Sequence, residues 1–482
     1  MGYICTDIKT TEMKIEQIYT GCLAQGAYYI VSGTEAVIID PLREVEPYLQ
    51  RLKEDGVTLK YIFETHFHAD FVSGHLDLSQ KTNAPIVYGP TAKPAFEAIV
   101  AEDEQIFEVG SVKLKALHTP GHTMESTCYL LMDEQGKDHS LFSGDTLFLG
   151  DVGRPDLAQK AADMTQDQLA GLLYESLMSK IMPLSDDVTV YPAHGAGSAC
   201  GKNMMKETVD SLGNQKKMNY ALNQPNKEAF IAAVTDGLLP PPAYFGFNVA
   251  MNKGGYASFD EVKTRAMNPL TADAFELVAE STGALILDTR PAGEFHKGFV
   301  PNAINIGIKG DFAPWVGALI GDVKQEILLV TDPGMEEEVI TRLSRVGFDH
   351  VLGYLAGGYT AWKEAGKEMD QVHRISPEEF AAQFDAEKSV VIDVRKEGEY
   401  AAEHVAEAYS KPLAYINEWT KDIHPDQHFF MHCQGGYRSM IAASILQARG
   451  YRNFTEVDGG FAAISKTAIP TTDFICQSKV LK

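Results

Sequence analysis

The sequence predicts an α/β protein of three domains. Its 482 residues correspond to roughly three domains of the usual 100–200 residues each. In the first half of the chain, turns that contain histidine or aspartate follow short apolar segments, and in the second half a strand–helix pattern occurs twice. Hydrophobic residues make up 45% of the chain, which is enough for buried cores, and no apolar run approaches the roughly 18 residues of a membrane span.

Charge and cysteine content narrow the class of protein. The net charge of −24 argues against non-specific binding to nucleic acids. The N-terminal segment Met1–Thr6 has no basic stretch followed by an apolar one, so no secretion signal is expected. Six irregularly spaced cysteines are typical of a reducing compartment. We therefore expect a cytoplasmic protein without nucleic-acid or membrane partners, and we expect it to form homo-oligomers.

The first chemical motif follows a short apolar segment. Leu59–Phe63 predicts a buried strand, and the segment behind it, Glu64–Phe71, contains His66, His68 and Asp70. This spacing puts three metal-capable side chains at one strand end.

Three later turns continue the pattern. His122 lies in a turn with Pro and Gly, Asp145 follows an apolar strand, and His194 lies in another turn. In this order the motifs resemble those of the metallo-β-lactamase superfamily, whose pattern is His-x-His-x-Asp-His, and the resemblance implies an N-terminal αββα sandwich. Phe71 stands where the last His of that pattern would be. Because phenylalanine cannot ligate a metal, a two-metal site would lack one ligand, whereas a one-metal site would be complete.

The second half of the chain is a repeat. Asp288 and Asp393 are 105 positions apart, and so are Arg290 and Arg395. The helix starts before them also correspond, with the capping hydroxyls of Thr271 and Ser376. Each copy has its own strand–helix alternation, so we expect two α/β domains with parallel sheets rather than a solenoid.

Domain boundaries are placed from breaks in these patterns. The proline-rich segment Leu238–Gly246 is expected to break regular structure at the end of the first domain. We predict domains at residues 1–255, 256–369 and 370–482.

The second copy contains a cysteine loop. An apolar strand leads into Cys433, and Arg438 and a helix beginning near Ser439 follow. Glycines allow backbone N–H groups to turn toward the sulfur and form an anion nest, which favours the thiolate form of a cysteine. The loop resembles that of a rhodanese, or sulfurtransferase, domain. This implies catalytic roles for Cys433 and Arg438. It also implies substrate-binding roles for the residues between them, Gln434, Gly435, Gly436 and Tyr437.

The first copy departs from the second at this loop. We expect Asp332 to occupy the position of Cys433, and a carboxylate cannot carry a sulfane sulfur. Pro333 also removes one backbone N–H from any anion nest. The middle domain is therefore predicted to be rhodanese-like without sulfur transfer, with a structural role or a role in a substrate passage. Arg290 and Arg395 are expected to be structural ion-pair partners.

Together, the motifs resemble the bacterial fusions of a persulfide dioxygenase with a sulfurtransferase, over essentially the whole chain. The resemblance implies one Fe(II) per chain, held by His66, His122 and Asp145. Two histidines and one carboxylate leave coordination positions open for a persulfide sulfur and O₂. Three further residues would orient the ligands or the substrate, or would be alternative metal ligands, namely His68, Asp70 and His194.

The same resemblance covers the element Gly153–Asp156. Its Arg154 either binds a substrate carboxylate or anchors the site through an ion pair. Cys22 and Cys200 are candidates for a sulfur relay.

The implied activity is oxidation of a low-molecular-weight persulfide, such as glutathione persulfide, by O₂ to sulfite and a thiol. Cys433 would then pass a sulfane sulfur to sulfite and give thiosulfate. Two alternatives stay open. One is a glyoxalase II-like thioester hydrolase with two Zn or Fe ions, and the other is a sulfur-carrier or scaffold protein in which only Cys433 has a function. The sequence leaves the identity of the metal and of the thiol carrier open.

Overall fold

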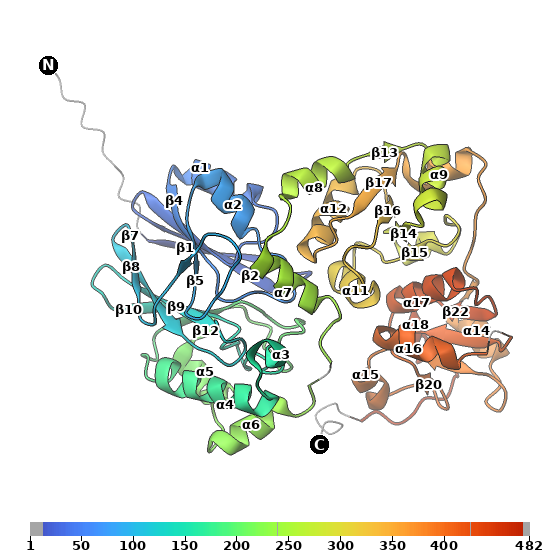
Figure 1. Cartoon of the computed structure of the whole chain (residues 1–482). Helices are drawn as coiled ribbons and strands as arrows, with labels where there is room; N and C mark the ends of the chain where they lie inside the picture. Colours follow the sequence, from blue (N-terminus) through green and yellow to red (C-terminus); the bar gives the residue numbers. More distant parts are fainter. Residues whose placement is uncertain (1–12, 239, 425, 476–482) are drawn as a thin grey trace. The chain divides into compact units, whose positions relative to one another are not determined.

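The computed structural model describes residues 13–238, 240–424 and 426–475 (Figure 1). The segment Met1–Thr6, on which the expectation about secretion rests, lies outside these residues. The chain divides into two compact units. The first runs to Phe259 and includes Ser344–Gly347, and the second comprises the rest of the chain from Asp260 on. Within the described ranges, no helix combines the length and the apolar character that crossing a membrane requires.

The first unit contains two six-stranded sheets. The first sheet consists, in spatial order, of β1 (Lys14–Thr20), β2 (Gln25–Ser32), β3 (Glu35–Ile39), β4 (Thr58–Phe63), β5 (Ile86–Tyr88) and β6 (Ile99–Val100). The second consists of β12 (Asp210–Ser211), β11 (Thr189–Pro192), β10 (Asp138–Gly144), β9 (Thr127–Met132), β8 (Val112–His118) and β7 (Ile106–Val109). Its helices are α1 (Glu46–Asp55), α2 (His75–Thr82), α3 (Gln159–Ala162), α4 (Gln166–Ser176) with the π-turn η1 (Leu177–Ile181), α5 (Leu212–Met218), α6 (Lys227–Thr235) and α7 (Phe245–Gly254).

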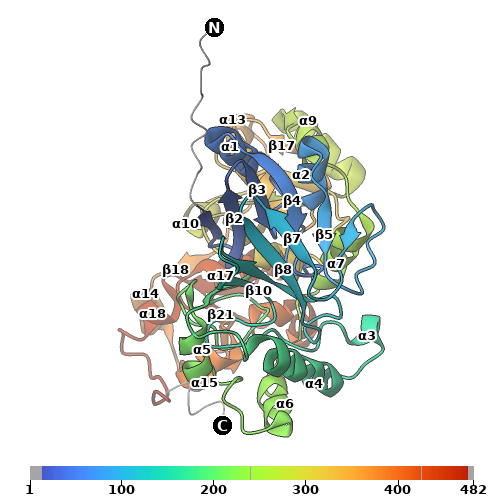
Figure 2. The ribbon, with the colours of Figure 1, turned by 90° about the vertical axis from the view of Figure 1, so that its left-hand side faces the viewer.

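Alternating side chains build the layers of this unit. On β2, Tyr28 and Ile30 belong to the core between the two sheets, whereas Tyr29 and Val31 belong to the core on the other face. Helices α1 and α2 cover that outer face, and α4 to α6 cover the outer face of the second sheet (Figures 1 and 2). The predicted four-layer sandwich is therefore confirmed.

The candidate metal motifs all follow the ends of strands. Leu59–Phe63 lies within β4, as predicted, and His66 comes three residues after its end. His122 follows β8, Asp145 directly follows β10, and His194 follows β11. Because β4, β10 and β11 run parallel to a neighbour in their sheets, their carboxyl ends deliver these turns to one edge of the sandwich.

Helix α7 corrects the expectation for the segment Leu238–Gly246, because the helix begins inside that segment at Phe245. Its buried Asn252 explains why the helix is needed. The side-chain amide donates to the carbonyl oxygens of His68 and Phe71, each at 2.8 Å, and accepts from the N–H of Ser73 at 2.9 Å. Asn252 therefore fixes the backbone of the first metal motif.

The second unit contains two five-stranded parallel sheets that share one strand order. The first repeat has the order β13 (Pro269–Leu270), β17 (Val351–Leu355), β16 (Ile327–Val330), β14 (Leu285–Asp288) and β15 (Ile304–Asn305). The second repeat has β18 (Arg374–Ile375), β22 (Phe454–Val457), β21 (Phe429–His432), β19 (Val391–Asp393) and β20 (Tyr409–Ser410). The predicted repeat and its parallel sheets are confirmed.

Helices surround both sheets. The unit begins with α8 (Phe259–Ala266), and the first repeat has α9 (Ala272–Thr282), α10 (Ala292–Phe295), α11 (Phe312–Leu319), α12 (Glu336–Arg345) and α13 (Gly358–Glu364). The second repeat has α14 (Pro377–Gln383), α15 (Glu397–Ala402), η2 (Leu413–Tyr415), α16 (Ile416–Trp419), η3 (Thr420–Asp422), α17 (Tyr437–Ala448) and α18 (Gly460–Ile464). As predicted, Thr271 caps α9 and Ser376 caps α14. Helix α17 begins at Tyr437, two residues before the predicted start near Ser439.

Strand register corrects the alignment of the two loops. Asp288 pairs with Val330 in the first repeat, and Asp393 pairs with His432 in the second. The residue after Val330 is Thr331, so Thr331, and not Asp332, occupies the position of Cys433. The prediction was wrong by one residue because the repeats differ in length between these strands. Its conclusion is unaffected, since a threonine hydroxyl cannot carry a sulfane sulfur either.

Replacing Asn252 by Ala should lower the free energy of unfolding of the first unit by about 3 kcal/mol, because it leaves buried backbone groups without partners. The measurement is a urea titration followed by circular dichroism. All three tryptophans lie in the second unit, so tryptophan fluorescence reports that unit separately and should not change. The exposed Asn214→Ala is the control. Equal urea midpoints for the two variants would contradict this role of α7.

Candidate functional site

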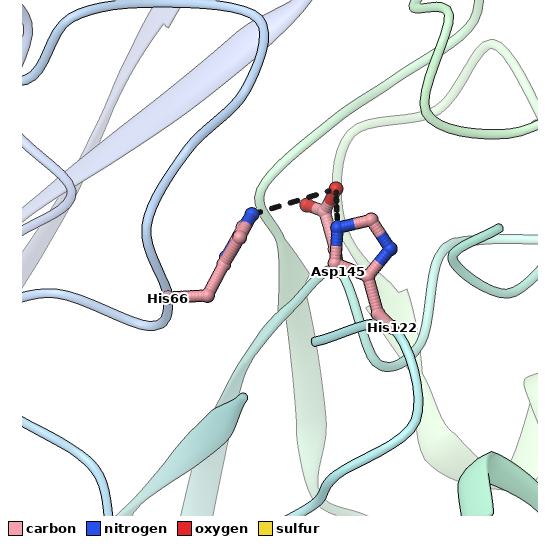
Figure 3. Close-up of side chains that lie close together, drawn as sticks. All are labelled: His66, His122 and Asp145. Atoms are coloured by element: carbon pink, nitrogen blue, oxygen red, sulfur yellow. Dashed lines mark ion pairs between the residues drawn. The ribbon is translucent and has the colours of Figure 1, made fainter. Parts of the chain in front are cut away.

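Three predicted ligands converge at the edge of the first unit (Figure 3). Nε2 of His122 lies 3.3 Å from Oδ2 of Asp145, and Nε2 of His66 lies 3.9 Å from the same oxygen. All three side chains are buried, and their ligand atoms lie within 4.8 Å of one another. The arrangement can hold one metal ion with two imidazoles and one carboxylate.

Hydrogen bonds fix the imidazoles of this group so that Nε2 is free. Nδ1 of His122 donates to the carbonyl oxygen of Arg154 at 2.9 Å. Nδ1 of His66 lies 3.0 Å from Oγ1 of Thr65, and that hydroxyl donates to Asp40 at 2.8 Å, so Nδ1 is the donor to Thr65. Burial, followed by the charges of neighbouring histidines, lowers the pKa of His66 well below its ordinary value, which keeps the imidazole neutral. Both rings therefore present a free Nε2 lone pair.

The carboxylate of Asp145 is suited to a cation. Its oxygens are buried, and neither has a hydrogen-bond partner among the described residues. A buried carboxylate without hydrogen bonds costs several kcal/mol unless a positive charge neutralises it. The side chains present here therefore fit a metal ion.

His68 does not belong to this group, but one of its ring nitrogens lies within 4.8 Å of the ligand atoms of Asp70 and His194. Its Nε2 lies 3.0 Å from Asp40 and 3.4 Å from Glu64, and its ring lies 4.3 Å from that of Phe71 between centroids. Burial opposes the charge, but the two carboxylates raise the pKa of His68 well above its ordinary value. The two carboxylates beside Nε2 favour a supporting role for His68 next to the group of His66, His122 and Asp145.

A second group of potential ligands adjoins the first. Nε2 of His194 lies 3.4 Å from Asp70 and 3.5 Å from Asp145, and Cys200 is within 4.8 Å of the ligand atoms of His194 and Asp145. Burial, followed by the charges of Asp70 and Asp145, raises the pKa of Cys200 well above its ordinary value. Without a cation, Cys200 is therefore a thiol and not a thiolate.

Cys22 lies apart from these groups. It is half-buried in the turn between β1 and β2, two residues before Ala24, whose carbonyl oxygen accepts from Nδ1 of His194 at 3.3 Å. It belongs to none of the candidate metal clusters found in the described part of the chain.

Gly153 and Arg154 support the ligands through the backbone. A Cβ atom at Gly153 would lie 1.9 Å from the carbonyl oxygen of Asp145 and 3.0 Å from Nδ1 of His122, so no side chain fits. The guanidinium of Arg154 forms two hydrogen bonds of 2.7 Å to Asp156. Of the two roles left open by the sequence, this favours the anchoring ion pair.

A cavity of about 370 Å³ opens beside His122. Small-molecule sites typically have roughly 300–1,000 Å³. Its apolar lining includes Phe67, Met124, Leu157 and Val249, and its polar lining includes Thr91, Lys93, Glu125 and Lys253. Neither lysine ammonium pairs with a carboxylate in the parts of the chain that the structure describes. They are therefore free to bind an anionic ligand.

In the cysteine loop of the second repeat, one backbone N–H group points to the sulfur. The N–H of Gly436, a residue with φ of 95°, donates to Sγ of Cys433 at 3.1 Å. A Cβ atom at Gly460 would lie 2.4 Å from the carbonyl oxygen of Cys433, which explains the second glycine of the Gly459–Gly460 turn. Arg438 forms two hydrogen bonds to Glu399, at 2.6 and 2.8 Å.

The side chains of two other loop residues form hydrogen bonds with groups outside the loop. Gln434 accepts from Arg395 at 3.1 Å, and the hydroxyl of Tyr437 donates to the carbonyl oxygen of Gly307 at 2.8 Å. The predicted structural ion pairs Arg290–Asp288 and Arg395–Asp393 are present.

The corresponding loop of the first repeat contains its own anion. The N–H of Gly334, at the position of Gly436, donates to the carboxylate of Glu336 at 2.8 Å. Glu336 stands at the position of Arg438, so the positive charge near the loop is replaced by a negative one. The loop of the first repeat therefore has the hydroxyl of Thr331 and the carboxylate of Glu336 where the second repeat has a thiol and a guanidinium.

Several supporting residues were missed by the sequence analysis. Asp40 directly follows the apolar strand β3 and has φ of 52°, so it carries the same signal that identified Asp145. Thr65 lies inside the first motif and could have been noted as a neighbour of His66. Lys93, Asn252 and Lys253 carry no local signal, because their roles depend on tertiary contacts.

Comparisons with known proteins agree with this architecture. The family profile of the metallo-beta-lactamase superfamily matches residues 20–194, and that of the rhodanese-like domain matches residues 271–365 and 376–467. A solved structure of a metallo-beta-lactamase from Staphylococcus aureus subsp. aureus COL is 31% identical, with a TM-score of 0.64. The match covers 72% of this chain and 99% of that one.

Two curated relatives differ in their activities. A probable hydroxyacylglutathione hydrolase from Schizosaccharomyces pombe is 31% identical over 163 residues, which cover 33% of this chain and 59% of the hydrolase. The human mitochondrial persulfide dioxygenase is 30% identical over 220 residues, which cover 45% of this chain and 78% of the dioxygenase. The chain thus spans less than two thirds of the hydrolase and more than two thirds of the dioxygenase.

Replacing Thr65 by Val should weaken metal binding by about 10- to 100-fold, because the variant loses the hydroxyl that orients His66. Metal affinity is measured by competition with a chelator of known affinity. Thr58→Val, at the exposed start of β4, is the matched control and should bind metal normally. Unchanged affinity in the Thr65 variant would show that the hydroxyl does not position the ligand.

Proposed function

We propose, because the chain belongs to the metallo-β-lactamase superfamily and carries two rhodanese-like domains, that it oxidises persulfides with O₂ and transfers sulfane sulfur. The observation that carries the proposal is Asp145. Its buried carboxylate, without hydrogen bonds among the described residues, faces the free Nε2 atoms of His66 and His122. The second half of the chain adds a cysteine whose sulfur accepts a backbone N–H.

The proposed metal is a single Fe(II), held by His66, His122 and Asp145. When bound, the iron supplies open coordination positions and electrons for the reaction of a persulfide with O₂. Thr65 and the carbonyl of Arg154 keep the two imidazoles in the required tautomer. Burial of all three ligands excludes bulk water from the reacting groups.

The cavity beside His122 is the proposed site for the thiol carrier. Its apolar walls suit an aliphatic chain and its two unpaired lysines suit carboxylates, as in glutathione persulfide. The overall reaction is R–S–SH + O₂ + H₂O, which gives R–SH, sulfite and two protons. His122 is one of the residues that line the cavity, so a carrier bound there would lie beside a proposed metal ligand.

Cys433 is the proposed sulfur carrier of the second reaction. Its sulfur takes a sulfane sulfur from a persulfide and passes it to sulfite, which gives thiosulfate. The N–H of Gly436 and the ion-paired Arg438 stabilise the negative charge on the sulfur. Thr331 and Glu336 prevent the same reaction in the first repeat, for which we propose a structural role.

Thioester hydrolysis is the second candidate function. Two adjoining sets of potential ligands favour it, namely His68 with Asp70 and His194, and Asp145 with His194 and Cys200. The carboxylate oxygens of Asp70 and Asp145 and Nε2 of His194 are buried and have no hydrogen-bond partner among the described residues. Such a group could hold a second metal ion, as a two-metal hydrolase requires. Phe71 opposes this alternative, since its buried ring occupies a ligand position of the superfamily pattern.

Replacing His122 or Asp145 by Ala should abolish metal binding and persulfide-dependent O₂ consumption, because each change removes one of three ligands. Sulfur transfer at Cys433 should persist, because that residue belongs to the other unit with its own core. Oxygen uptake, metal content and thiosulfate sulfurtransferase activity are measured on the same preparations. Oxygen consumption that survives in either variant would show that the ligand set is wrong.

Replacing Lys93 and Lys253 together by Ala should raise the KM for glutathione persulfide about tenfold, which corresponds to roughly 1.4 kcal/mol of lost binding. The KM for the uncharged 2-hydroxyethyl persulfide should not change. Lys113→Ala, exposed on β8, is the matched control. Equal effects on both substrates would mean that the lysines do not recognise the charge of the carrier.

Replacing Cys433 by Ser should change the main product from thiosulfate to sulfite while O₂ consumption is largely preserved. A serine hydroxyl is not ionised at neutral pH and cannot hold a sulfane sulfur. Thr331→Val is the control at the equivalent position and should leave the product ratio alone. Thiosulfate formed by Cys433→Ser at the wild-type rate would contradict the proposal and would direct attention to Cys22 and Cys200.

A further inference from the structure

A buried row of polar groups lies behind the sulfur of Cys433. Oγ of Ser439, on α17, lies 3.4 Å from this sulfur and 2.6 Å from Oε1 of Glu456, on β22. Arg374, on β18, donates from Nε to the other oxygen of Glu456 at 2.5 Å. Cys433 is 1% exposed, and Ser439 and Glu456 are 0% exposed. The row thus connects the thiol to a buried carboxylate.

The first repeat lacks every member of this row. Arg374 pairs with Glu456 between β18 and β22, and the equivalent pair between β13 and β17 is Pro269 and Tyr354. Six residues after Thr331, where the second repeat has Ser439, the first has Glu337. Both repeats form the same sheet, so the row is not required for the fold. It occurs only in the repeat that has the thiol.

The chemistry of the hydroxyl restricts what this row can do. A serine hydroxyl has one proton, and Ser439 has two close partners, so it donates to one and accepts from the other. If Glu456 is ionised, Ser439 donates to it and accepts the S–H of Cys433. If the thiol is ionised, Glu456 is protonated and donates to Ser439, which donates to the sulfur. The two states differ only by one proton shifted along each hydrogen bond.

Sulfur loading requires a thiolate, because the thiol is a poor nucleophile. The nearly complete burial of Cys433 restricts direct proton transfer to bulk water. The buried carboxylate of Glu456 is the nearest acceptor that the row provides.

We propose that Ser439 and Glu456 form a proton relay for Cys433. Ser439 contacts the sulfur and is a catalytic residue, whereas Glu456 acts through it and is a positioning residue. This inference rests on the proposed sulfur transfer. The thiol proton passes to Oγ of Ser439, and the hydroxyl proton passes to Glu456.

The loading step then balances without another reagent. The thiolate attacks the sulfane sulfur of R–S–SH, which gives Cys433–S–SH and the thiolate R–S⁻. The proton of Cys433–S–SH passes to R–S⁻, which leaves as R–SH. In the unloading step, Cys433–S–S⁻ and sulfite give Cys433–S⁻ and thiosulfate, and the electron pair of the broken S–S bond stays on the sulfur of Cys433. Glu456 returns the proton to Cys433 through Ser439.

The surroundings of the row are consistent with this role. Burial raises the pKa of Glu456 above its ordinary value, although Arg374 opposes the shift. A carboxyl group in this environment holds a proton more readily than an exposed one. Arg374 remains next to the row in both states, and the single negative charge moves between Glu456 and Cys433.

Other charged or titratable groups surround the row. They are Asp458 beside Arg374, Arg438 with Glu399 on the side of α15, Asp393 and Arg395 at the end of β19, and His432 at the end of β21. Each of them is held in an ion pair or a hydrogen bond, and none forms a hydrogen bond with Oγ of Ser439 in the described part of the chain.

The test uses the full chain, with thiosulfate as the sulfur donor. Loading of Cys433 is followed by sulfite release, and alkylation of Cys433 by iodoacetamide is followed by mass spectrometry, both as functions of pH. For Glu456→Gln and Ser439→Ala, both rates should fall by about a hundredfold at neutral pH, in line with the loss of a proton-transfer group. Both rates should recover at higher pH, because hydroxide then replaces the relay.

The matched control is Asp458→Asn. Asp458 also pairs with Arg374, so this change removes one negative charge beside the arginine, and Asp458 forms no hydrogen bond with Ser439. It should keep the wild-type rates and pH dependence. A purely electrostatic role of Glu456 predicts the opposite direction for Glu456→Gln, namely faster alkylation at lower pH, because the positive charge of Arg374 would keep only Asp458 as a partner.

Three results would overturn the relay. They are wild-type pH dependence in both variants, a shift to lower pH in Glu456→Gln, and a loss of rate that high pH does not restore. If Glu456→Gln fails to fold, Ser439→Ala decides, because it removes one oxygen and no charge. If the wild-type chain itself does not load sulfur on Cys433, the proposed sulfur transfer fails, and that outcome is distinct from failure of the relay.

Discussion

The burial of Asp145 is the constraint on which the first unit depends. Its carboxylate is withdrawn from water and has no hydrogen bond among the described residues, which costs several kcal/mol unless a cation is bound. The surrounding groups also favour the binding of a cation at Asp145. Thr65 and the carbonyl of Arg154 turn two imidazoles toward Asp145, and Gly153 allows the chain to pass between them. Helix α7 holds the backbone of the first motif from the other side.

The two repeats of the second unit have the same fold, but only the second repeat has the cysteine loop with its thiol. Its two repeats share strand order, caps and internal ion pairs. They differ in a few side chains around one loop, where a thiol, an arginine and a buried glutamate in one repeat correspond to Thr331, Glu336 and Tyr354 in the other. The buried cores and the internal ion pairs therefore maintain the fold, whereas the side chains of the loop determine the chemistry.

Much of the fold and of the site could be predicted from the sequence because the signals are local. Turns with His122, Asp145 and His194 directly follow strands, and parallel strands bring such turns together. The duplication was visible because Asp288 and Arg290 recur at a constant spacing. Caps at Thr271 and Ser376 were predictable for the same reason.

The remainder depends on contacts between distant residues. Nothing in the sequence around His68 shows that its Nε2 lies beside Asp40. The residue of the first repeat that corresponds to Cys433 was predicted one position too late, because only strand pairing defines the alignment of the two repeats. The segment Leu238–Gly246 was predicted to be irregular because it contains three consecutive prolines, whereas α7 begins within it, at Phe245. Glu456 was missed because its role follows from Ser439, 17 positions away.

The most direct test of the account is metal analysis of anaerobically purified protein, combined with oxygen uptake on addition of glutathione persulfide. The account predicts close to one iron ion per chain and oxygen uptake that depends on it, as expected for two histidines and one carboxylate. Two zinc ions per chain, with hydrolysis of a glutathione thioester and no oxygen uptake, would contradict it.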